Sequence, residues 1–231
     1  VSEITWDPAT KRVNEENLPS LPHAIAYSGA AIKGSTLYVV GGQGGDEETA
    51  PANIFLSLDL KKLKAGWKEL ATWEGPARRK AITVAQSIGI ITYIYIIGGE
   101  GLYKDAEGKT QVTPLTDGYR YSLQYKEWKR IADSPQTITA SPAIKYGQSH
   151  ILVFGGDRGQ KLSDGREDNQ PASTSDLLVY HTITDTWIKK GKVPLPVKAT
   201  EAVAYKGGIV LASGETGASK TTPQIQFMNH D

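Results

Sequence analysis

The sequence contains no cysteine, and this absence excludes several classes of protein at once. A fold held together by disulfides, a zinc site with cysteine ligands and catalysis by a thiol all require this residue. The chain also has no excess of charge of one sign, because 26 Lys and Arg residues face 25 Asp and Glu residues and leave a net charge of +1. This balance gives no electrostatic footprint for nucleic acid or for an anionic membrane surface, so we expect neither as a partner.

Long hydrophobic runs and helical patterns are also missing. The longest apolar stretch, Ile88 to Ile97, is interrupted by Gly89 and Thr92 and is too short to span a bilayer. No segment keeps a sustained period of 3.6 residues, so helices should be minor. The first residues, Val1-Ser2-Glu3-Ile4, carry no signal-peptide pattern, and the start without Met suggests a processed, trimmed or incomplete chain. With 39% hydrophobic and 22% charged residues, the composition is that of a globular protein.

A repeated motif is the strongest signal in the sequence. A short apolar strand followed by two glycines occurs three times, and a degenerate fourth copy follows: Gly41-Gly42, Gly98-Gly99, Gly155-Gly156 and Ser213-Gly214. The first positions of these pairs, 41, 98, 155 and 213, are separated by 57, 57 and 58 residues. Such even spacing indicates an internal repeat.

Each repeat continues in the same way. After a polar loop comes a short strand whose apolar or aromatic residue is separated by six residues from a Trp: Leu60 and Trp67, Tyr121 and Trp128, Tyr180 and Trp187. A turn that contains Pro and a new apolar stretch follow. Strands rich in Val, Ile and Tyr, with turn residues between them, favour an all-β repeat of four short strands. We expect the Tyr and Trp pairs to pack between adjacent sheets.

These features resemble the kelch repeat family, and the resemblance covers nearly the whole chain. It implies an all-β fold, a kelch-type β-propeller of four-stranded blades, in a single domain over residues 1–231. About four blade repeats are present, where the family usually has six. We expect a partial blade at 1–22, blades at about 23–75, 76–135 and 136–196, and a partial blade at 197–231. The double glycines and the aromatic pairs are then architecture and not chemistry.

The two ends of the chain leave two arrangements open. Residues 4–19 are typical of the last two strands of a blade, with Trp6 and Val13 at the aromatic positions, and residues 200–227 are typical of the first two or three. Either the ends complete each other and close a ring of four blades, or two further blades are absent, and we favour the second. For a soluble monomer we predict that the N-terminal strand pairs with the C-terminal blade. An incomplete propeller predicts a homodimer, because its end sheets stay uncovered.

The longest predicted loops follow the double glycines, at residues 41–52, 98–117 and 155–175. By analogy with other propellers, these loops and the turns between blades meet on one face, where ligands bind. Charged residues in these loops and turns are the candidate binding residues: Glu100, Asp157, Arg158, Glu215, His23, Arg78 and Arg79. Arg can bind a carboxylate through two hydrogen bonds, and a carboxylate can move protons between hydroxyl groups. The set suits a small, charged, hydroxylated ligand.

A closer resemblance concerns one kelch branch, the N-acetylneuraminate epimerases or sialic acid mutarotases, and in particular their circularly permuted relatives. The segments that carry it are residues 18–27, 73–78, 150–157, 176–187 and 213–223. The family motif on the last blade reads Gly-Glu, three residues, Gly, one residue, Arg-Thr. This chain keeps the Glu as Glu215, has Ser219 and Thr221 at the Gly and Arg positions, and carries Lys220 beside the replaced Arg.

This resemblance implies an isomerase that interconverts the α and β anomers of N-acetylneuraminate, a small sugar acid. It implies Glu215 as the proton-transfer residue and the bacterial periplasm or the cell exterior as the location. The substrate-binding set is then Arg78, Arg79, Asp157, Arg158, Glu100, Lys220 and His23. Arg78, with Arg158 or Lys220, is expected to hold the substrate carboxylate, although Lys cannot reproduce the two-point grip of Arg. No cofactor and no metal are expected.

The sequence features bear on two other functions. A non-catalytic kelch propeller that binds a carbohydrate or a protein stays open, because Thr221 replaces the Arg and a fold does not determine function. A copper oxidase of kelch type is excluded by the lack of Cys, and the four His residues are scattered along the sequence. The glycine-rich stretch at residues 41–45 has no helical pattern after it, so it is not a phosphate-binding loop.

Overall fold

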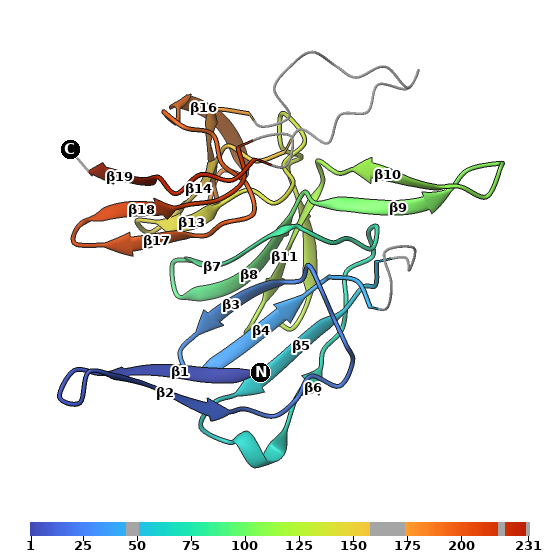
Figure 1. Cartoon of the computed structure of the whole chain (residues 1–231). Coiled ribbons are helices and arrows are strands. Elements are labelled where there is room, and N and C mark those ends of the chain that lie inside the picture. Colours follow the sequence, from blue (N-terminus) through green and yellow to red (C-terminus); the bar gives the residue numbers. More distant parts are fainter. Residues whose placement is uncertain (45–50, 158–173, 217–219, 230–231) are drawn as a thin grey trace.

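The computed structural model describes residues 1–44, 51–157, 174–216 and 220–229, and their regular structure is almost entirely β-strand. The single helical element in this part of the chain is one turn of 3-10 helix, η1 (Leu63–Ala65). Four sheets follow one another in an arc, and two hairpins extend beside them (Figure 1). The arrangement is a β-propeller with four blades, so the all-β fold predicted from the repeats is confirmed.

The blades are antiparallel sheets whose strands are hydrogen-bonded in chain order. Blade 1 consists of β3 (Gly29–Lys33), β4 (Thr36–Val40), β5 (Phe55–Asp59) and β6 (Lys68–Glu69). Blade 2 consists of β7 (Ile82–Ile88), β8 (Ile91–Ile97), β11 (Gly118–Ser122) and β12 (Trp128–Ile131). Blade 3 consists of β13 (Ala143–Tyr146), β14 (His150–Phe154), β15 (Asp176–His181) and β16 (Thr186–Lys192). Blade 4 has three strands in the described residues: β17 (Ala202–Tyr205), β18 (Gly208–Ala212) and β19 (Ile225–Asn229).

The hydrophobic cores lie between the blades. Strand β8 illustrates this arrangement, because Ile94 and Ile96 belong to the cluster shared with blade 1, whereas Tyr95 and Ile97 belong to the cluster shared with blade 3. A third cluster joins blade 3 to blade 4. A strand buried on both faces has a continuous apolar sequence instead of an alternating one. This burial explains why the longest apolar run of the chain ends in β8.

The aromatic pairs pack between blades, as predicted. Tyr121 of β11 lies opposite Trp128 of β12, with ring centroids 5.2 Å apart, and both rings contact Phe55 of blade 1 at 4.8 and 5.1 Å. In blade 3 the Tyr180 and Trp187 rings are 5.0 Å apart, and the Tyr180 ring is 6.0 Å from that of Tyr95 in blade 2. Each pair therefore fills the gap toward the preceding blade.

The same Trp residues also tie neighbouring blades through hydrogen bonds. The indole Nε1 of Trp128 donates to the carbonyl of Ala71 at 2.6 Å, and that of Trp187 donates to the carbonyl of Ala132 at 3.0 Å. Trp67 of blade 1 donates in the same manner to Pro19, which follows the N-terminal hairpin, at 2.9 Å. Each acceptor belongs to the segment that leaves the preceding sheet, so the bond recurs from blade to blade.

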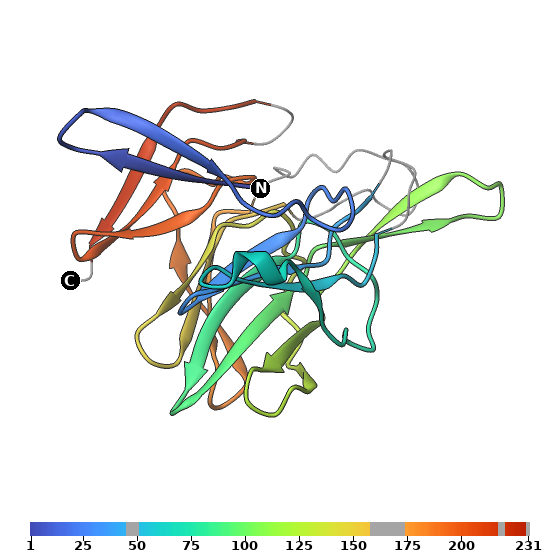
Figure 2. The same ribbon diagram turned by 90° about the horizontal axis from the view of Figure 1, so that it is seen from below.

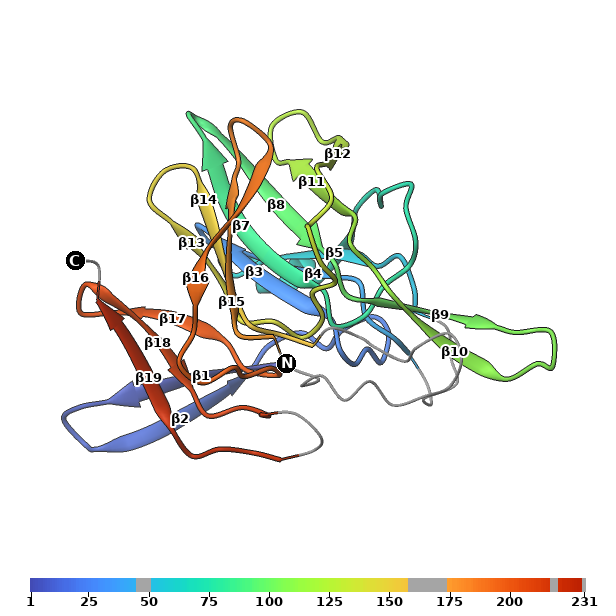
Figure 3. The same ribbon diagram turned by 90° about the horizontal axis from the view of Figure 1, so that it is seen from above.

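The segment between Gly98 and Asp117, predicted as a long loop, contains a hairpin. Strands β9 (Glu100–Lys104) and β10 (Thr110–Pro114) pair antiparallel and extend away from the blades (Figures 1 and 3). Asp105 closes its turn, because its Oδ1 accepts hydrogen bonds from the backbone amides of Glu107 and Lys109 at 3.2 and 2.8 Å. Such an Asx-type turn lets a polar segment fold back on itself. Of the other two long loops, residues 45–50 and 158–173 lie outside the described part of the chain.

The predicted pairing of the N-terminal strand with the C-terminal blade is wrong. Strand β1 (Ser2–Asp7) pairs with β2 (Arg12–Asn17) in a sheet separate from β17–β19, and Figure 1 shows this hairpin apart from blade 4, although the two overlap in the view of Figure 2. Trp6 lies opposite Val13, the same register as Tyr121 and Trp128, so β1 and β2 correspond to the third and fourth strands of a blade. Blade 4 already contains a third strand, β19. The two ends therefore cannot merge into one four-stranded sheet.

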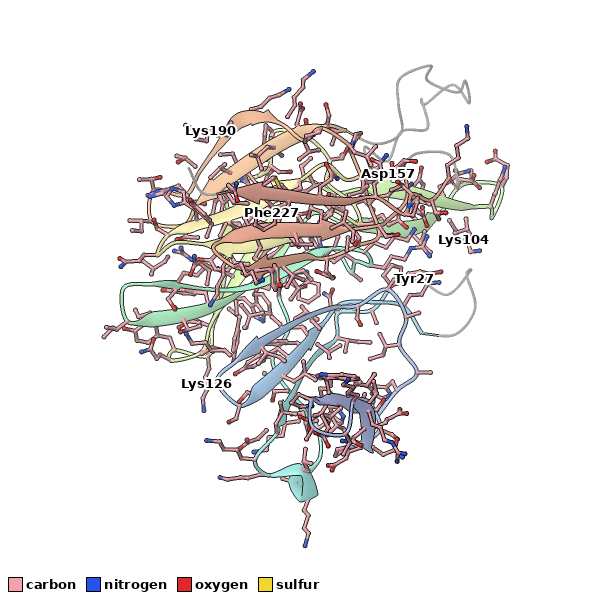
Figure 4. All side chains as sticks on the ribbon, turned by 60° about the vertical axis from the view of Figure 1, so that its left-hand side comes forward. Tyr27, Lys104, Lys126, Asp157, Lys190 and Phe227 are labelled. Carbon is pink, nitrogen blue, oxygen red and sulfur yellow. The ribbon has the colours of Figure 1, made fainter. Side chains whose placement is uncertain are left out.

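Both end sheets carry exposed apolar side chains. In blade 4, Val203 and Phe227 lie on one face because each is paired with Val210, and Phe227 lies on the surface that faces the viewer in Figure 4. In the N-terminal hairpin, Ile4, Trp6 and Val13 are exposed. These are the residue types that pack between the other blades.

Candidate functional site

Four turns, one before the first strand of each blade, meet beside the centre of the arc. Each contains a residue with a left-handed backbone conformation: Tyr27 (φ 57°), Lys80 (φ 54°), Ala140 (φ 51°) and Ala199 (φ 54°). The amide of Lys80 donates to the carbonyl of Tyr27 at 2.8 Å, Ala140 donates to Lys80 at 2.9 Å, and Ala199 donates to Ala140 at 2.8 Å. This series of bonds, which we call the turn series, links all four blades and explains why residues without glycine's freedom hold a positive φ.

The double glycines bring a second set of residues next to the turn series. A Cβ on Gly98 would lie 2.4 Å from the carbonyl oxygen of Ile138 in blade 3, and Gly98 has a φ of 63°. Only glycine allows the backbone to approach the next blade this closely. The residue after each pair then forms a single β-bridge with its own turn: Ala26 with Gln43, Arg79 with Glu100, Thr139 with Asp157 and Lys198 with Glu215. Gln43, Glu100, Asp157 and Glu215 therefore occupy equivalent positions in the four blades.

The turn series, together with Glu100, Asp157 and Glu215 of the bridge positions, surrounds a cavity of about 460 Å³. Its charged lining residues are Lys80, Glu100, Asp157, Lys198, Glu201 and Glu215. The remainder is mainly small residues and hydroxyls, together with one aromatic ring, that of Tyr27. The volume is suited to a single small molecule, and the lining offers many hydrogen-bonding groups.

Glu100 is the least exposed of the three carboxylates at the equivalent positions, and it binds two cations. Its Oε1 accepts from Nε of Arg79 and from Nζ of Lys80, both at 2.8 Å. Arg79 also reaches the side-chain oxygen of Gln43 in blade 1. Only 9% of the Glu100 side chain is exposed, and two cations satisfy its charge, so this carboxylate serves to fix the two cations in place.

Asp157 and Glu215 share one lysine. Nζ of Lys198 forms an ion pair with Oδ2 of Asp157 and lies 3.9 Å from Oε2 of Glu215. The exposed fractions of the two carboxylate side chains are 24% for Asp157 and 43% for Glu215. Glu215 is thus the most accessible of the three carboxylates at equivalent positions, and its contact with the shared cation is the loosest.

The structure brings together three of the residues predicted from the sequence. Glu100, Asp157 and Glu215 all line the cavity, and Arg79 lies directly behind Glu100. His23 and Lys220 are exposed and do not belong to the lining. His23 instead contacts Glu69 at 3.3 Å. Arg158 lies outside the described residues.

Arg78 has a different role from the one predicted. Its side chain is completely buried and is absent from the cavity lining. Nη2 binds Oδ2 of Asp117 at 2.7 Å, Nη1 donates to the carbonyls of Gly98 and Asp117 at 3.0 Å each, and Nε donates to that of Pro76 at 3.2 Å. The expectation that Arg78 holds a substrate carboxylate is therefore corrected, since its guanidinium anchors the loop that leaves the double glycine.

Sequence reasoning missed most of the lining, including its aromatic residue and three of its charged residues: Tyr27, Lys80, Lys198 and Glu201. Desolvation raises the pKa of the Glu201 carboxyl, although the residue as a whole is exposed. The signal that could have found them is the repeat itself, because each follows the Pro-containing turn that starts a blade. Tyr27, Lys80 and Ala199, the neighbour of Lys198, have a left-handed conformation, and such a turn is hard to predict from the sequence when the residue is not glycine.

The described residues offer no group of three or more His, Asp or Glu side chains arranged to hold a metal ion. In the same part of the chain, no helix has the length and apolar character needed to cross a membrane.

The fold and the site define a class of protein: a β-propeller with a central cavity lined by carboxylates and lysines. The family description "N-acetylneuraminate epimerase" matches residues 18–176, more than half of the chain. The chain belongs to the N-acetylneuraminate epimerase family.

Individual relatives agree with this assignment. The N-acetylneuraminate epimerase of Haemophilus influenzae is 29% identical over 230 residues, which cover 89% of this chain and 57% of the relative. That of Yersinia enterocolitica is 30% identical over 227 residues, which cover 87% of this chain and 55% of the relative. The chain therefore spans little more than half the length of these curated relatives.

Among solved structures, the one titled "Structure of YjhT" superposes with a TM-score of 0.70 at 20% sequence identity. The match covers 92% of this chain and 65% of the other. This likeness supports the propeller fold.

Proposed function

We propose that this chain takes part in the interconversion of the α and β anomers of N-acetylneuraminate, with Glu215 as the proton-transfer residue. One observation carries the proposal. Of three carboxylates at equivalent positions around the cavity, Glu100 and Asp157 form close ion pairs, whereas Glu215 keeps an exposed carboxylate with its nearest amine 3.9 Å away. A group that exchanges protons with a sugar hydroxyl needs this accessibility. Family membership supports N-acetylneuraminate as the sugar.

The reaction requires opening and closing of the sugar ring. The bond between the anomeric carbon and the ring oxygen breaks, the anomeric hydroxyl loses its proton, and the ring oxygen gains one. A single carboxylate can accept the first proton and deliver it to the ring oxygen. Rotation of the open-chain keto acid and closure on its other face, with the proton moved in reverse, give the other anomer. No bond to the protein forms, so the chain's part is to bind the sugar and relay one proton.

The substrate carboxylate needs a cationic partner, and the proposal assigns this role to Lys80 and Lys198. Both line the cavity. Each is held by a carboxylate, Lys80 by Glu100 and Lys198 by Asp157, so both amines are fixed near the ligand before it binds. An amine binds a carboxylate as a point charge, and two of them compensate in part for the Arg that Thr221 replaces.

A second candidate function is a non-catalytic propeller that binds a carbohydrate. The observation that favours it is the pairing of both cavity lysines with carboxylates, which lowers the net positive charge available to a sugar acid. A neutral sugar would then be a better ligand than N-acetylneuraminate. The two candidates differ in whether the protein changes the rate of anomer exchange.

Proton NMR of freshly dissolved β-N-acetylneuraminate, with and without micromolar protein, tests the proposal. We expect a faster approach to anomeric equilibrium with the wild-type chain and a loss of that acceleration in Glu215→Gln. Glu201→Gln is the matched control. Glu201 lines the same cavity, but it does not occupy the position after the glycine pair that Glu215 shares with Glu100 and Asp157. If Glu215→Gln kept the wild-type rate, the assignment of Glu215 would be wrong. Line broadening of the sugar without acceleration would favour the binding module.

A further inference from the structure

Tyr27 is the single aromatic side chain among the described residues that line the cavity. It occupies the first position of the turn series, where the other three blades carry Lys80, Ala140 and Ala199. Half of the residue, 50%, is exposed, although its backbone is fixed by the bond from the Lys80 amide. Figure 4 shows Tyr27 on the same side of the molecule as Asp157.

The backbone at this position does not explain the choice of tyrosine. The left-handed conformation is unfavourable for every residue with a Cβ, and glycine would adopt it freely. The equivalent residues of the other blades have the same conformation with φ between 51° and 54°, and two of them are alanine. The fold therefore accepts a minimal side chain here. The presence of a half-exposed aromatic ring at this position must therefore be explained by what the ring itself contacts.

The ring is held against two cations. The guanidinium carbon of Arg79 lies 5.6 Å and the amine of Lys80 lies 5.3 Å from the ring centroid. Both cations are fixed by Oε1 of Glu100, at 2.8 Å each. Cations at this distance attract the negative face of an aromatic ring. The ring is therefore held in place before any ligand binds, and its exposed part presents a flat apolar surface to the cavity.

The geometry points to Tyr27 as the platform on which the pyranose ring of the ligand packs. A pyranose presents apolar C–H groups on one side and hydroxyls around its edge. The cavity offers the matching arrangement, because one aromatic surface stands among hydroxyls and charged groups such as Thr139, Ser141 and Lys198. A rigid aromatic contact places the ring with little loss of side-chain freedom. The inference rests on the proposed function only for the identity of the sugar.

Binding of the α-methyl glycoside of N-acetylneuraminate tests this inference apart from catalysis, because the glycoside cannot change its anomer. Saturation-transfer NMR and a titration would compare wild type with Tyr27→Phe, Tyr27→Ala and Tyr27→Gly. We expect Tyr27→Phe to bind within about threefold of wild type, and the Ala and Gly variants to lose at least about tenfold in affinity. Ala140→Gly is the matched control at the equivalent position of blade 3, with unchanged affinity.

Urea unfolding separates a binding role from a structural one. Tyr27→Gly removes the unfavourable conformation, so we expect its unfolding midpoint at or above that of wild type while its affinity falls. Wild-type affinity in Tyr27→Ala, or no binding of the glycoside by wild type, would overturn the inference. If Tyr27→Ala loses affinity for the glycoside while wild type does not accelerate the anomer exchange of free N-acetylneuraminate, the role of Tyr27 as a platform is supported and the proposed reaction is wrong. If wild type accelerates anomer exchange and Tyr27→Ala binds the glycoside as tightly as wild type, the proposed reaction is supported and the role of Tyr27 as a platform is wrong.

Discussion

Lys198 and Glu215 are joined through both their main chains and their side chains. The amide of Lys198 donates to the carbonyl of Glu215 at 3.0 Å, the amide of Glu215 donates back at 2.9 Å, and Nζ of Lys198 lies 3.9 Å from Oε2 of Glu215. The same amine binds Asp157 of blade 3. The position of the proposed proton-transfer group is therefore set by a residue that also connects two blades.

Replacing Lys198 by Met should reduce both stability and activity. The change removes the ion pair between Lys198 and Asp157 from a partly buried place, and we expect a loss of about 1–2 kcal/mol in the free energy of unfolding, between the values for exposed and buried pairs. A displaced Glu215 should also slow anomer exchange by about tenfold or more. Urea unfolding and proton NMR measure the two effects. Lys129→Met, which breaks an exposed pair with Glu127, should change stability by less than about 0.5 kcal/mol. Equal effects of the two substitutions would contradict the role given to Lys198.

Gly98→Ala should destabilise the propeller more than an alanine at another glycine of similar backbone. Its Cβ would meet the Ile138 carbonyl at 2.4 Å, whereas a Cβ on Gly147, with φ of 54°, meets nothing within 4 Å. Gly147→Ala therefore reports the conformational cost alone, about 1–2 kcal/mol. We expect about 1–3 kcal/mol in addition for Gly98→Ala, because a backbone carbonyl of the next blade must move. Thermal and urea unfolding of both variants give the difference, and similar losses would show that the close approach is unimportant.

Arg78→Lys tests whether Arg78 is structural. The planar guanidinium serves four acceptors at once, and an amine cannot reproduce this pattern. We expect a loss of about 3 kcal/mol in the free energy of unfolding, typical of a damaged buried ion pair. Arg130→Lys, in an exposed pair with Asp133, should cost less than about 0.5 kcal/mol. A stable Arg78→Lys variant with weakened sugar binding would restore the role first predicted from the sequence.

The paired histidines of blade 3 should make stability depend on pH. The rings of His150 and His181 lie 4.7 Å apart on neighbouring strands, and desolvation, with the nearby His181, lowers the pKa of His150 below its usual value of 6.5. The unfolded chain then binds this proton more readily than the folded one, so stability falls as pH drops below about 6.5. Urea unfolding at pH 7.5 and 5.5 should show a smaller decrease in His150→Gln than in wild type. Parallel decreases would rule out His150 as the cause.

Much of the fold could be predicted from the sequence because the motifs that indicate it recur along the chain. The double glycines and the Tyr–Trp pairs recur at fixed spacing, and each mark stands where two blades meet, as Gly98 and Tyr121 do. The hairpin β9–β10 was missed because its polar sequence lacks the alternation of a strand with one buried face, and its turn depends on one side chain, Asp105.

The candidate site was only partly predictable. Glu100, Asp157 and Glu215 were found because they follow the glycines, whose place near the centre is fixed by packing. Arg78 and Arg79 are adjacent in the sequence and end in opposite environments, one buried in blade 2 and one beside the cavity. Arg79 lies in an extended segment that is bridged to Glu100, where successive side chains point to opposite sides, and neither composition nor spacing reveals which of the two faces the cavity.

The hydrogen bonds between blades are built from parts that blades 1, 2 and 3 each carry. Each of these blades has a Trp that donates to the preceding unit and a turn whose carbonyl accepts from the following blade. A duplicated blade inserted into such an array already carries the donor and the acceptor for its hydrogen bonds to the neighbouring blades. Lengthening the array therefore requires no new interface to evolve, and selection is left free to vary the few side chains, such as Tyr27 and Glu215, in which the units differ.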